Sequence, residues 1–358
     1  RDVIWPLEAK LRPEAVFSGA LLGCIEMIRS GTTCFADMYF YEDMVAKAVK
    51  KSGLRAVLAE GIIETEREEH FKGMLKRSVN FIQKFHKSRN GRINCLFGPH
   101  AVYSCSSELL SEISELATKL GVGIHVHLAE SKLNSSKLED AYGGSEVEFL
   151  DKIGLLKHHV LAAHCVNLSV RDMKILSDRR VNVAYVPVAN MKLGLGAARI
   201  NELIDLGVNV GLGTDGPASN NSLDMFETMK VAALLQKNAY SDPTVLPAEE
   251  VVKMATNYGA KALGLENQIG SIETGKKADL ILLDVSKPHL KPLHNIYATI
   301  VYSARGSDVD TTIVDGKIVM ENRMMKTLNE QIVITQAEKT AFNLISVNRL
   351  PINVSAVE

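Results

Sequence analysis

The chain has 358 residues, of which 46% are hydrophobic and 23% are charged, and its formal net charge is −1. This composition indicates a globular protein with a sizeable core. A balance so close to neutral argues against general attraction to nucleic acid or to an anionic membrane, and no apolar stretch approaches the ~18 residues of a membrane span. We therefore expect neither nucleic acid nor a membrane among its partners.

The cysteines predict a reducing compartment. They are five, an odd number, with no CxxC pair, and most lie in apolar runs. Scattered cysteines of this kind are typical of reduced, buried thiols in a cytosolic protein, so we expect a cytoplasmic location. The chain opens on Arg1 rather than on methionine, and we expect a further segment before it.

Short β-branched runs alternate with amphipathic stretches along the first 264 residues. Patterns such as MVAKAVKKSG, ELLSEISELATKLG and SVRDMKILSDR are helical, and several end in glycine or a basic residue, as helix ends prefer. This alternation, with nearly continuous apolar strands, predicts parallel strands covered by helices. The candidate strands are residues 32–38, 54–62, 93–100, 122–130, 159–165, 181–188 and 208–216.

Seven strands are one fewer than a closed (β/α)8 barrel needs. We therefore expect an α/β protein whose TIM-type barrel occupies residues 1–264 and lacks its first strand, which would lie upstream of Arg1. The texture changes near residue 265, and residues 265–325 are predicted to form β-hairpins outside the barrel, with a tight turn at Asp315–Gly316. Residues 326–358 are expected to be a polar C-terminal tail.

Ionisable residues recur at the ends of these otherwise apolar strands. In a parallel barrel the carboxyl ends of the strands carry the chemistry. A hydrophobic strand that ends in an ionisable group, repeated several times, is hard to obtain from an ordinary core. The residues at these ends are Asp37, His100, His127 with Glu130, His164 and Asp215.

The stretch HVHLAE contains two histidines that share one face of a strand. His125 and His127 are two residues apart and point the same way. His127 is nearer the end where the chemistry collects, whereas His125 is ~6–7 Å deeper. Each histidine alone would more often be structural. Because the other strand ends are also ionisable, we expect His127 to be functional and His125 to be packed and hydrogen-bonded in the interior.

Asp215 and His164 each allow a structural and a functional interpretation. In GTDG, Asp215 could simply accept backbone hydrogen bonds, and His164 could be a buried histidine bonded to a carbonyl. We favour the functional interpretation, in which the carboxylate binds a metal and takes a proton from water. Together with His127 and Glu130 these residues suit zinc or iron(II).

The ligand supply falls short, however, because a catalytic metal needs at least three protein ligands. We expect one divalent metal, with zinc first and iron or manganese as alternatives, and an HxH pair upstream of Arg1. The chain as given is expected to bind metal weakly.

A family resemblance is carried by an ordered set of motifs. HLAE, LAAHC, NMKLGLG, GLGTDGPASNNSLDMFE, MATNYGAKALGL and IGSIETGKKADLILLD resemble the amidohydrolase superfamily. More closely they resemble its 5′-methylthioadenosine/S-adenosylhomocysteine deaminases. GTTCFADMYF and IWPLEAKL fit the same group, so the resemblance covers residue 3 to about residue 325.

The resemblance implies a (β/α)8 barrel with one divalent metal and a small β-sandwich built from both chain ends, with residues 265–325 as its C-terminal part. It implies that His127 and Asp215 are metal ligands and that Asp215 also accepts the proton of the attacking water. His164 would hold and polarise that water, and Glu130 would pass a proton to the purine ring nitrogen. The same likeness places Glu8 and His100 against the ribose and the substrate.

The sequence departs from the family pattern twice. The HxH pair of the first barrel strand is absent from the chain. Where many members read HNPxSNxKL, this chain has Tyr185 in place of the histidine and Ala189 in place of the serine. The seventh-strand contacts and the substrate identity therefore stay open.

Three functions remain at this point. The first is hydrolytic deamination of an adenine nucleoside, such as S-adenosylhomocysteine, 5′-methylthioadenosine or an adenosine-like compound, to the inosine analogue and ammonia, by a homo-oligomer. The second is another deamination or a dechlorination on the same barrel, with guanine or an s-triazine as substrate. The third is a truncated homologue that binds a ligand or partner without catalysis.

Overall fold

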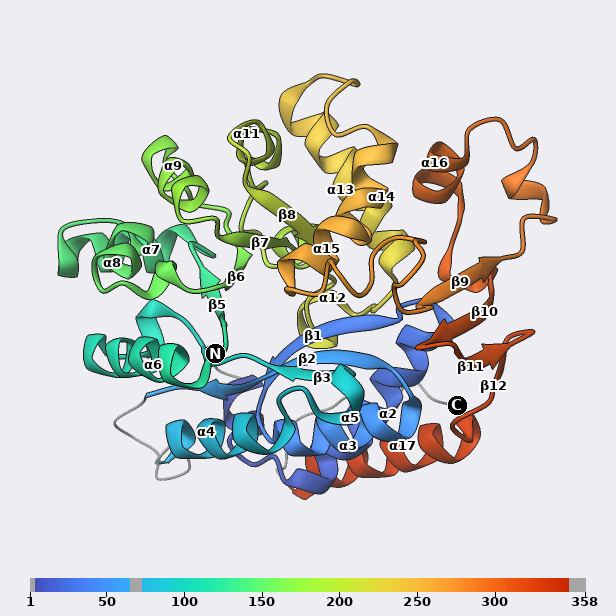
Figure 1. Cartoon of the computed structure of the whole chain (residues 1–358), viewed down its shortest axis with the longest axis horizontal. Coiled ribbons are helices and arrows are strands. Elements are labelled where there is room, and N and C mark those ends of the chain that lie inside the picture. The colour runs from blue at the N-terminus through green and yellow to red at the C-terminus, as the bar shows by residue number, and fades with distance from the viewer. Residues whose placement is uncertain (1–3, 65–72, 348–358) are drawn as a thin grey trace.

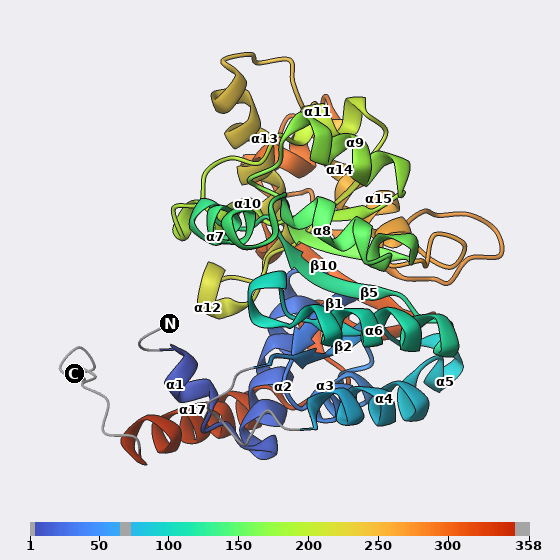
Figure 2. The same ribbon diagram turned by 90° about the vertical axis from the view of Figure 1, so that its left-hand side faces the viewer.

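A computed structural model of the chain describes residues 4–64 and 73–347 (Figure 1). The protein is α/β, with parallel strands in the middle of the molecule and helices around them (Figures 1 and 2). Buried aliphatic side chains such as Leu58, Ile124 and Val126 form one extensive core between the two layers. No helix among the described residues is long and apolar enough to cross a membrane.

The parallel strands follow one another in space in chain order. β1 pairs with β2, β2 with both β3 and β4, and β5 through β8 pair consecutively. Two isolated parallel bridges, Phe97 to Ile124 and Ala101 to His127, join the chain on either side of β4 to β5. The bounds are β1 Cys34–Tyr39, β2 Arg55–Ile62, β3 Ile93–Cys95, β4 Gly98–Pro99, β5 Ile124–Leu128, β6 Val160–His164, β7 Asn182–Tyr185 and β8 Asn209–Leu212.

With β3 and β4 taken as one interrupted strand, the described residues contain the seven parallel strands that the sequence predicts. β1 and β8 are the outer members of this run, and no ladder joins them within the described residues. All residues of β2 are buried, as expected of a parallel strand that is covered on both faces. The prediction of parallel strands is confirmed.

The helices begin and end where the local sequence favours it. Ser106 caps α6 by accepting a hydrogen bond from the backbone N–H of Leu109, and Gly121 ends α6 in the left-handed conformation with φ of 63°. The bounds are α1 Ile4–Glu8, α2 Pro13–Arg29, α3 Glu42–Ser52, α4 Met74–Phe85, α5 Ser88–Gly91, α6 Ser107–Leu120, α7 Lys132–Tyr142, α8 Glu146–Lys152, α9 Val170–Asp178, α10 Pro187–Lys192, α11 Ile200–Asp205, α12 Pro217–Asn220, α13 Met225–Tyr240, α14 Ala248–Ala255 and α15 Asn257–Ala262.

A separate antiparallel sheet follows the helices and strands of the first part. Its order is β12-β11-β10-β9, with β9 Leu280–Leu283, β10 Val309–Val314, β11 Lys317–Glu321 and β12 Met324–Met325. The predicted tight turn joins β10 to β11. Asp315 and Gly316 both have positive φ, 52° and 74°, as a two-residue hairpin turn requires.

Two expectations for the C-terminal part are wrong. The stretch that begins at Ala298, predicted to be part of a β-hairpin, is helical up to Ser303. α16 (Ile296–Ala298) is followed there by a π-helical turn (Thr299–Ser303). The side chain of Asn295 caps them by accepting a hydrogen bond from the backbone N–H of Ala298 at 2.9 Å. This cap and the tertiary packing outweigh the strand preference of the β-branched residues.

The segment expected as a polar tail contains a long helix, α17 (Glu330–Val347), which lies beside α2 (Figures 1 and 2). Arg29 of α2 forms an ion pair with Glu330 at 2.8 Å. Just before α17, the Thr327 hydroxyl donates to the carbonyl of Ser52 at 2.7 Å. The C-terminal part is therefore anchored to the helical layer that covers β1 and β2.

Candidate active site

Histidines from three neighbouring strands meet at the carboxyl ends of the parallel run. The ring centroids of His100 and His127 are 4.8 Å apart, and those of His127 and His164 are 5.4 Å apart. His100 follows β4, His127 is in β5 and His164 is the last residue of β6. The three rings form one contiguous group, as the sequence predicts.

The orientation of His127 is fixed by a backbone carbonyl. Its Nδ1 lies 2.7 Å from the carbonyl oxygen of His100. Because a carbonyl can only accept, Nδ1 carries the proton and Nε2 keeps its lone pair. Desolvation and the neighbouring His164 both lower the pKa of His127. Its Nε2 is therefore a neutral donor atom of the kind that metal ions bind.

Glu130 and Asp215 stand on the loops that follow β5 and β8. An oxygen of the Glu130 carboxylate lies 4.0 Å from His164 Nε2, and the charges of Glu130 and Asp215 both act on His127. The side chain of Asn167 donates to the Glu130 carbonyl at 3.1 Å, which holds the loop. The residues predicted from the strand ends are thus gathered at one place.

The backbone at these strand ends is strained. Ala129, His164, Cys165 and Asp215 have φ values of 49°, 73°, 50° and 62°, a region that residues other than glycine seldom adopt. Such strain persists only where the surrounding structure fixes it, and it is concentrated at functional sites. These positive φ values mark sharp turns of the backbone at or next to the ionisable residues of the strand ends.

Two further carboxyl groups lie near this group, Asp37 on β1 and Glu42 at the start of α3. Desolvation, together with a smaller contribution from the charge of Asp215, raises the pKa of Asp37 to about 6. Glu42 is fully buried: one oxygen accepts the backbone N–H of Tyr39 at 3.1 Å, and its Oε2 has no partner among the described residues. Desolvation, followed by the charges of Asp37 and Glu60, holds the pKa of Glu42 well above its ordinary range.

Glu8 reaches the same end of the sheet from α1. Its carboxylate accepts a hydrogen bond from the hydroxyl of Tyr39 at 2.9 Å. Desolvation raises the pKa of Glu8, while the Tyr39 hydrogen bond lowers it. His100 Nδ1 lies 2.8 Å from the hydroxyl of Ser104. Glu8 is therefore tied to β1, next to Asp37.

His125 is buried, as expected, but it is not fully hydrogen-bonded. Its Nδ1 has no partner among the described residues. Burial and the adjacent His127 and His164 lower its pKa to about 3, so the ring is neutral. At Nδ1, therefore, the expected hydrogen bond is not found among the described residues.

A model of the amidohydrolase family matches residues 2–319 of the chain. The chain belongs to the amidohydrolase family. The match spans the whole parallel run and most of the antiparallel sheet, so the likeness of the motifs extends to the full arrangement.

Curated relatives and solved structures agree with this assignment. The chain is 50% identical to the 5′-deoxyadenosine deaminase of Methanosarcina mazei over 343 residues, 96% of this chain and 79% of that protein. It is 47% identical to the 5-methylthioadenosine/S-adenosylhomocysteine deaminase of Dictyoglomus thermophilum over 96% of this chain and 80% of that protein.

An adenosine deaminase from Xanthomonas campestris with bound zinc superposes with a TM-score of 0.91 at 32% identity, covering 96% of this chain and 78% of that one. A zinc-complexed atrazine chlorohydrolase from Arthrobacter aurescens, at 23% identity over 94% of this chain and 79% of that one, has a TM-score of 0.87 and shares the fold.

The donor atoms of this amidohydrolase fit part of a metal site. The free Nε2 of His127 is a suitable ligand, and the carboxyl groups of Asp215 and Asp37 repel each other in a way that a cation would relieve. However, within the described residues (4–64 and 73–347), no three His, Cys, Asp or Glu side chains are grouped so that they could hold a metal ion. These residues supply an incomplete coordination set.

The fold brings two further side chains to the site that the sequence did not predict there, Tyr39 and Asn190. Tyr39 binds Glu8, and Asn190 of α10 binds His164 with its side-chain oxygen 2.9 Å from Nδ1. Asn190 lies within NMKLGLG, the segment that carries the resemblance, so a signal was present. The departures at Tyr185 and Ala189 are both buried, and the Tyr185 hydroxyl accepts a hydrogen bond from Gln236 of α13 at 3.0 Å.

Proposed function

We propose that the protein is a metal-dependent deaminase of an adenine nucleoside. Water replaces the 6-amino group, and the products are the inosine analogue and ammonia. The substrate class follows the relatives, which are named for 5′-deoxyadenosine, 5-methylthioadenosine and S-adenosylhomocysteine. The single observation that carries the proposal is the gathering of His127, His164, Glu130 and Asp215 at the carboxyl ends of the parallel strands.

His127 and Asp215 would hold a divalent metal, zinc first and iron or manganese as alternatives. The remaining ligands, which we expect to be an HxH pair, would have to come from outside the described residues. When bound, such an ion lowers the pKa of water and polarises the reacting carbon. The imidazole of His127 is already oriented for this role by the His100 carbonyl.

The chain's own side chains would divide the proton transfers. Asp215 accepts a proton from the attacking water, and His164 orients that water with its Nε2. Glu130 donates a proton to the ring nitrogen next to the carbon under attack, which neutralises the negative charge that develops there. The departing amine then takes up the proton that Asp215 accepted and leaves as ammonia, while the remaining hydroxyl proton of the attacking water returns to Glu130 as the 6-oxo group forms. General acid–base steps of this kind contribute ~10²–10⁴-fold each.

Glu8 and His100 would bind the substrate outside the reacting centre. Glu8 offers a carboxylate to the ribose hydroxyls, and the hydrogen bond from Tyr39 fixes its direction. His100 stands next to the His127 ring, so it can contact the base or sugar of the same nucleoside. These contacts would distinguish a nucleoside from a free base such as guanine.

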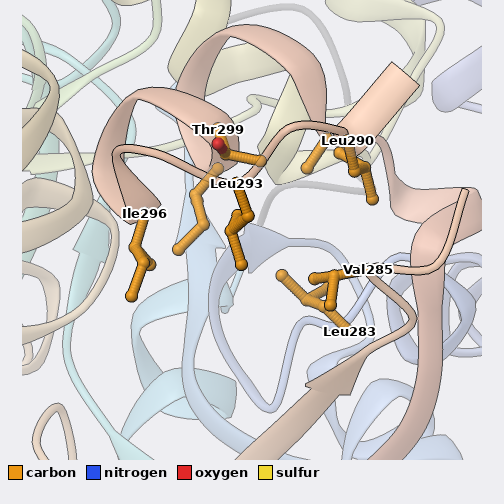
Figure 3. A pocket seen from close by; sticks show the side chains of 8 residues that line it. Leu283, Val285, Leu290, Leu293, Ile296 and Thr299 are labelled. Atoms are coloured by element: carbon orange, nitrogen blue, oxygen red, sulfur yellow. The ribbon is translucent and has the colours of Figure 1, made fainter. Parts of the chain in front are cut away.

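We also propose the finer architecture: an eight-stranded barrel with the domain boundary near residue 265, and residues 265–325 as one layer of a small β-sandwich. β9 is an edge strand, and its Leu282 is 55% exposed. Beside it lies an apolar hollow of about 200 Å³, lined by Leu283, Val285, Leu290 and Leu293 among others (Figure 3). An open edge and an apolar hollow are features that a second sheet would cover.

A homo-oligomer in the cytoplasm completes the proposal. All five cysteines are free, and four of them are buried, which supports a protein that works with reduced thiols.

The decisive experiment uses the intact protein, with the segment that we expect before Arg1, and loads it with zinc. It measures ammonia release from 5′-deoxyadenosine, 5′-methylthioadenosine, S-adenosylhomocysteine and adenosine, with guanine and an s-triazine in parallel. The Asp215→Asn variant serves as the matched inactive control. Turnover of a nucleoside that the variant lacks supports the proposal. Turnover of guanine or the triazine alone would favour the second function, and no turnover with any metal would favour a non-catalytic protein.

A further inference from the structure

We propose that Asn190 is a positioning residue that holds His164 as its Nδ1–H tautomer and so keeps the Nε2 lone pair directed toward Glu130 and the attacking water. The part that concerns the water rests on the proposed function. The part that concerns the tautomer rests only on the geometry around the two side chains.

The contact between Asn190 and His164 is short and shielded from solvent. The side-chain oxygen of Asn190 lies 2.9 Å from Nδ1 of His164. Asn190 is 0% exposed and His164 is 2% exposed. An amide oxygen can only accept, so Nδ1 must carry a proton, and in the neutral ring Nε2 is then the acceptor. The tautomer of the ring is therefore set by its partner rather than by water.

The ring cannot easily turn away from this partner. The backbone of His164 is in the left-handed region with φ of 73°, and the next residue, Cys165, donates its N–H to the carbonyl of Leu128 at 3.0 Å. On its other side, Nε2 lies 4.0 Å from Glu130. Nδ1 is thus bonded to Asn190, whereas Nε2 faces Glu130 without a hydrogen bond to it.

α10 holds Asn190 firmly in place. Pro187 starts the helix at its first position, and the backbone N–H of Asn190 donates to the carbonyl of Val186 at 3.0 Å. The carbonyl of Asn190 accepts from Leu195 at 2.9 Å. Its backbone is therefore fully bonded, which leaves the side chain to serve His164.

The amide nitrogen of Asn190 is the second observation. This Nδ2 is buried and has no hydrogen-bond partner among the described residues. An unpartnered buried donor destabilises a folded protein, so a side chain chosen for packing alone would not be an amide here. An amide oxygen supplies an acceptor without adding a charge next to Glu130 and Asp215, which a carboxylate at this position would do.

The two departures from the family pattern leave this contact in place, because Asn190 is the asparagine that the pattern HNPxSNxKL itself contains. Tyr185 and Ala189 are buried, and Tyr185 is bonded to Gln236, away from His164. Asn190 is the member of this segment whose side chain contacts the histidine of the sixth strand. The contribution of this segment to the reaction is therefore made through His164.

The test combines ring-nitrogen NMR of protein labelled with ¹⁵N-histidine with steady-state kinetics. The His164 signals are assigned by their loss in His164→Gln. We expect a protonated Nδ1 and an unprotonated Nε2 in the wild type, a changed tautomer in Asn190→Leu, and the wild-type tautomer in Asn190→Asp, whose carboxylate still accepts. A partner of a functional histidine is typically worth ~10–100-fold, so Asn190→Leu should lower kcat by that factor with KM nearly unchanged.

Asn182→Leu is the matched control. Asn182, like Asn190, has a buried side-chain amide, but it lies in β7 and bonds to the Val160 carbonyl and to Asn209. Its loss should reduce stability and leave the His164 signals as they are. If Asn190→Leu does not fold, the wild-type and Asn190→Asp spectra still decide the tautomer.

A protonated Nε2 in the wild type, or unchanged ring signals and kcat in Asn190→Leu, would overturn the inference. Failure of the proposed function would look different: no nucleoside would be deaminated, while the ring signals would still report the tautomer.

Discussion

The amino ends and the carboxyl ends of the parallel strands differ in whether their ionisable side chains are paired. At the amino ends, Arg55, the first residue of β2, is fully buried and forms two hydrogen bonds to Asp279, at 2.7 and 3.1 Å. Asp279 also accepts from the backbone N–H of Asp315 at 2.7 Å. The charges there are matched and their hydrogen bonds are made, which joins the strands to the antiparallel sheet.

At the carboxyl ends the ionisable groups are left open. Glu130 approaches His164 only to 4.0 Å, Glu42 has an unpartnered buried oxygen, and Asp37 and Asp215 are close enough for one charge to raise the pKa of the other. A hydrogen-bonded ion pair stays in place, and breaking it is destabilising. An ionisable group without a close partner costs stability, but it can bind a ligand or transfer a proton. The proposed site is thus at the end where the structure leaves ionisable groups without close partners.

Asp215→Asn should have the largest effect. The amide fills the same space but cannot take a proton from water, so kcat should fall by ~10²–10⁴-fold or more, while the unfolding temperature stays near that of the wild type. Ammonia release and thermal unfolding measure the two parts. Asp205→Asn, on an exposed residue at the end of α11, should be without effect. Retention of a tenth of wild-type activity by Asp215→Asn would remove Asp215 from the mechanism.

Glu130→Gln should lower kcat by at least ~10²-fold, because the amide keeps the shape but cannot deliver a proton to the ring nitrogen. The metal content, measured on the same samples, should not change, since Glu130 is proposed to act beside the metal and not to bind it. Near-normal turnover would show that Glu130 is an ordinary loop residue. Loss of metal together with activity would make it a ligand.

Arg55→Met tests the buried ion pair at the amino ends of the strands. Removal of one partner leaves Asp279 buried and unpaired, which should lower the free energy of unfolding by ~3–5 kcal/mol, while kcat of the folded protein stays close to wild type. Urea unfolding measures this change. Arg55→Met/Asp279→Leu should recover much of the loss, and Lys253→Met, which breaks an exposed pair with Glu249, should cost less than ~1 kcal/mol. Equal losses in the Arg55 and Lys253 variants would show that burial is not the cause.

Glu42→Gln should give a smaller effect that depends on pH. The folded protein holds the pKa of Glu42 well above the ordinary value, so below that ordinary value the carboxyl is protonated in both the folded and the unfolded chain. As the pH rises above it, the unfolded chain releases the proton first, and the wild type loses stability. Glutamine resembles the protonated form and avoids this loss.

The difference in unfolding free energy between Glu42→Gln and wild type should therefore grow in favour of the variant from pH 4 to pH 8. Chemical unfolding at several pH values measures it. A difference that is constant, or that grows in favour of the wild type, would contradict a protonated Glu42.

The site could be predicted from sequence to the extent that it depends on strand ends. His100, His127, Glu130, His164 and Asp215 each follow or end an apolar run, and parallel strands bring such ends together. Asn190 could not be found in this way, because α10 lies after β7 and only the packing of that helix brings its amide to His164. The role of Tyr39 could not be predicted either, because its hydroxyl in β1 reaches Glu8 in α1 only through the packing of the two elements.

The sequence by itself determined the parallel strands, the hairpin turn at Asp315–Gly316 and the ionisable residues that end the strands, because these follow from local periodicity and from the conformations that turns require. The tertiary structure alone decided that residues 296–303 are helical, that α17 lies beside α2, that Arg55 is matched by Asp279, and that Asn190 sets the tautomer of His164. Each of these depends on contacts between residues far apart in the chain. Their free energy comes from burial and from the pairing of buried polar groups, which no local pattern encodes.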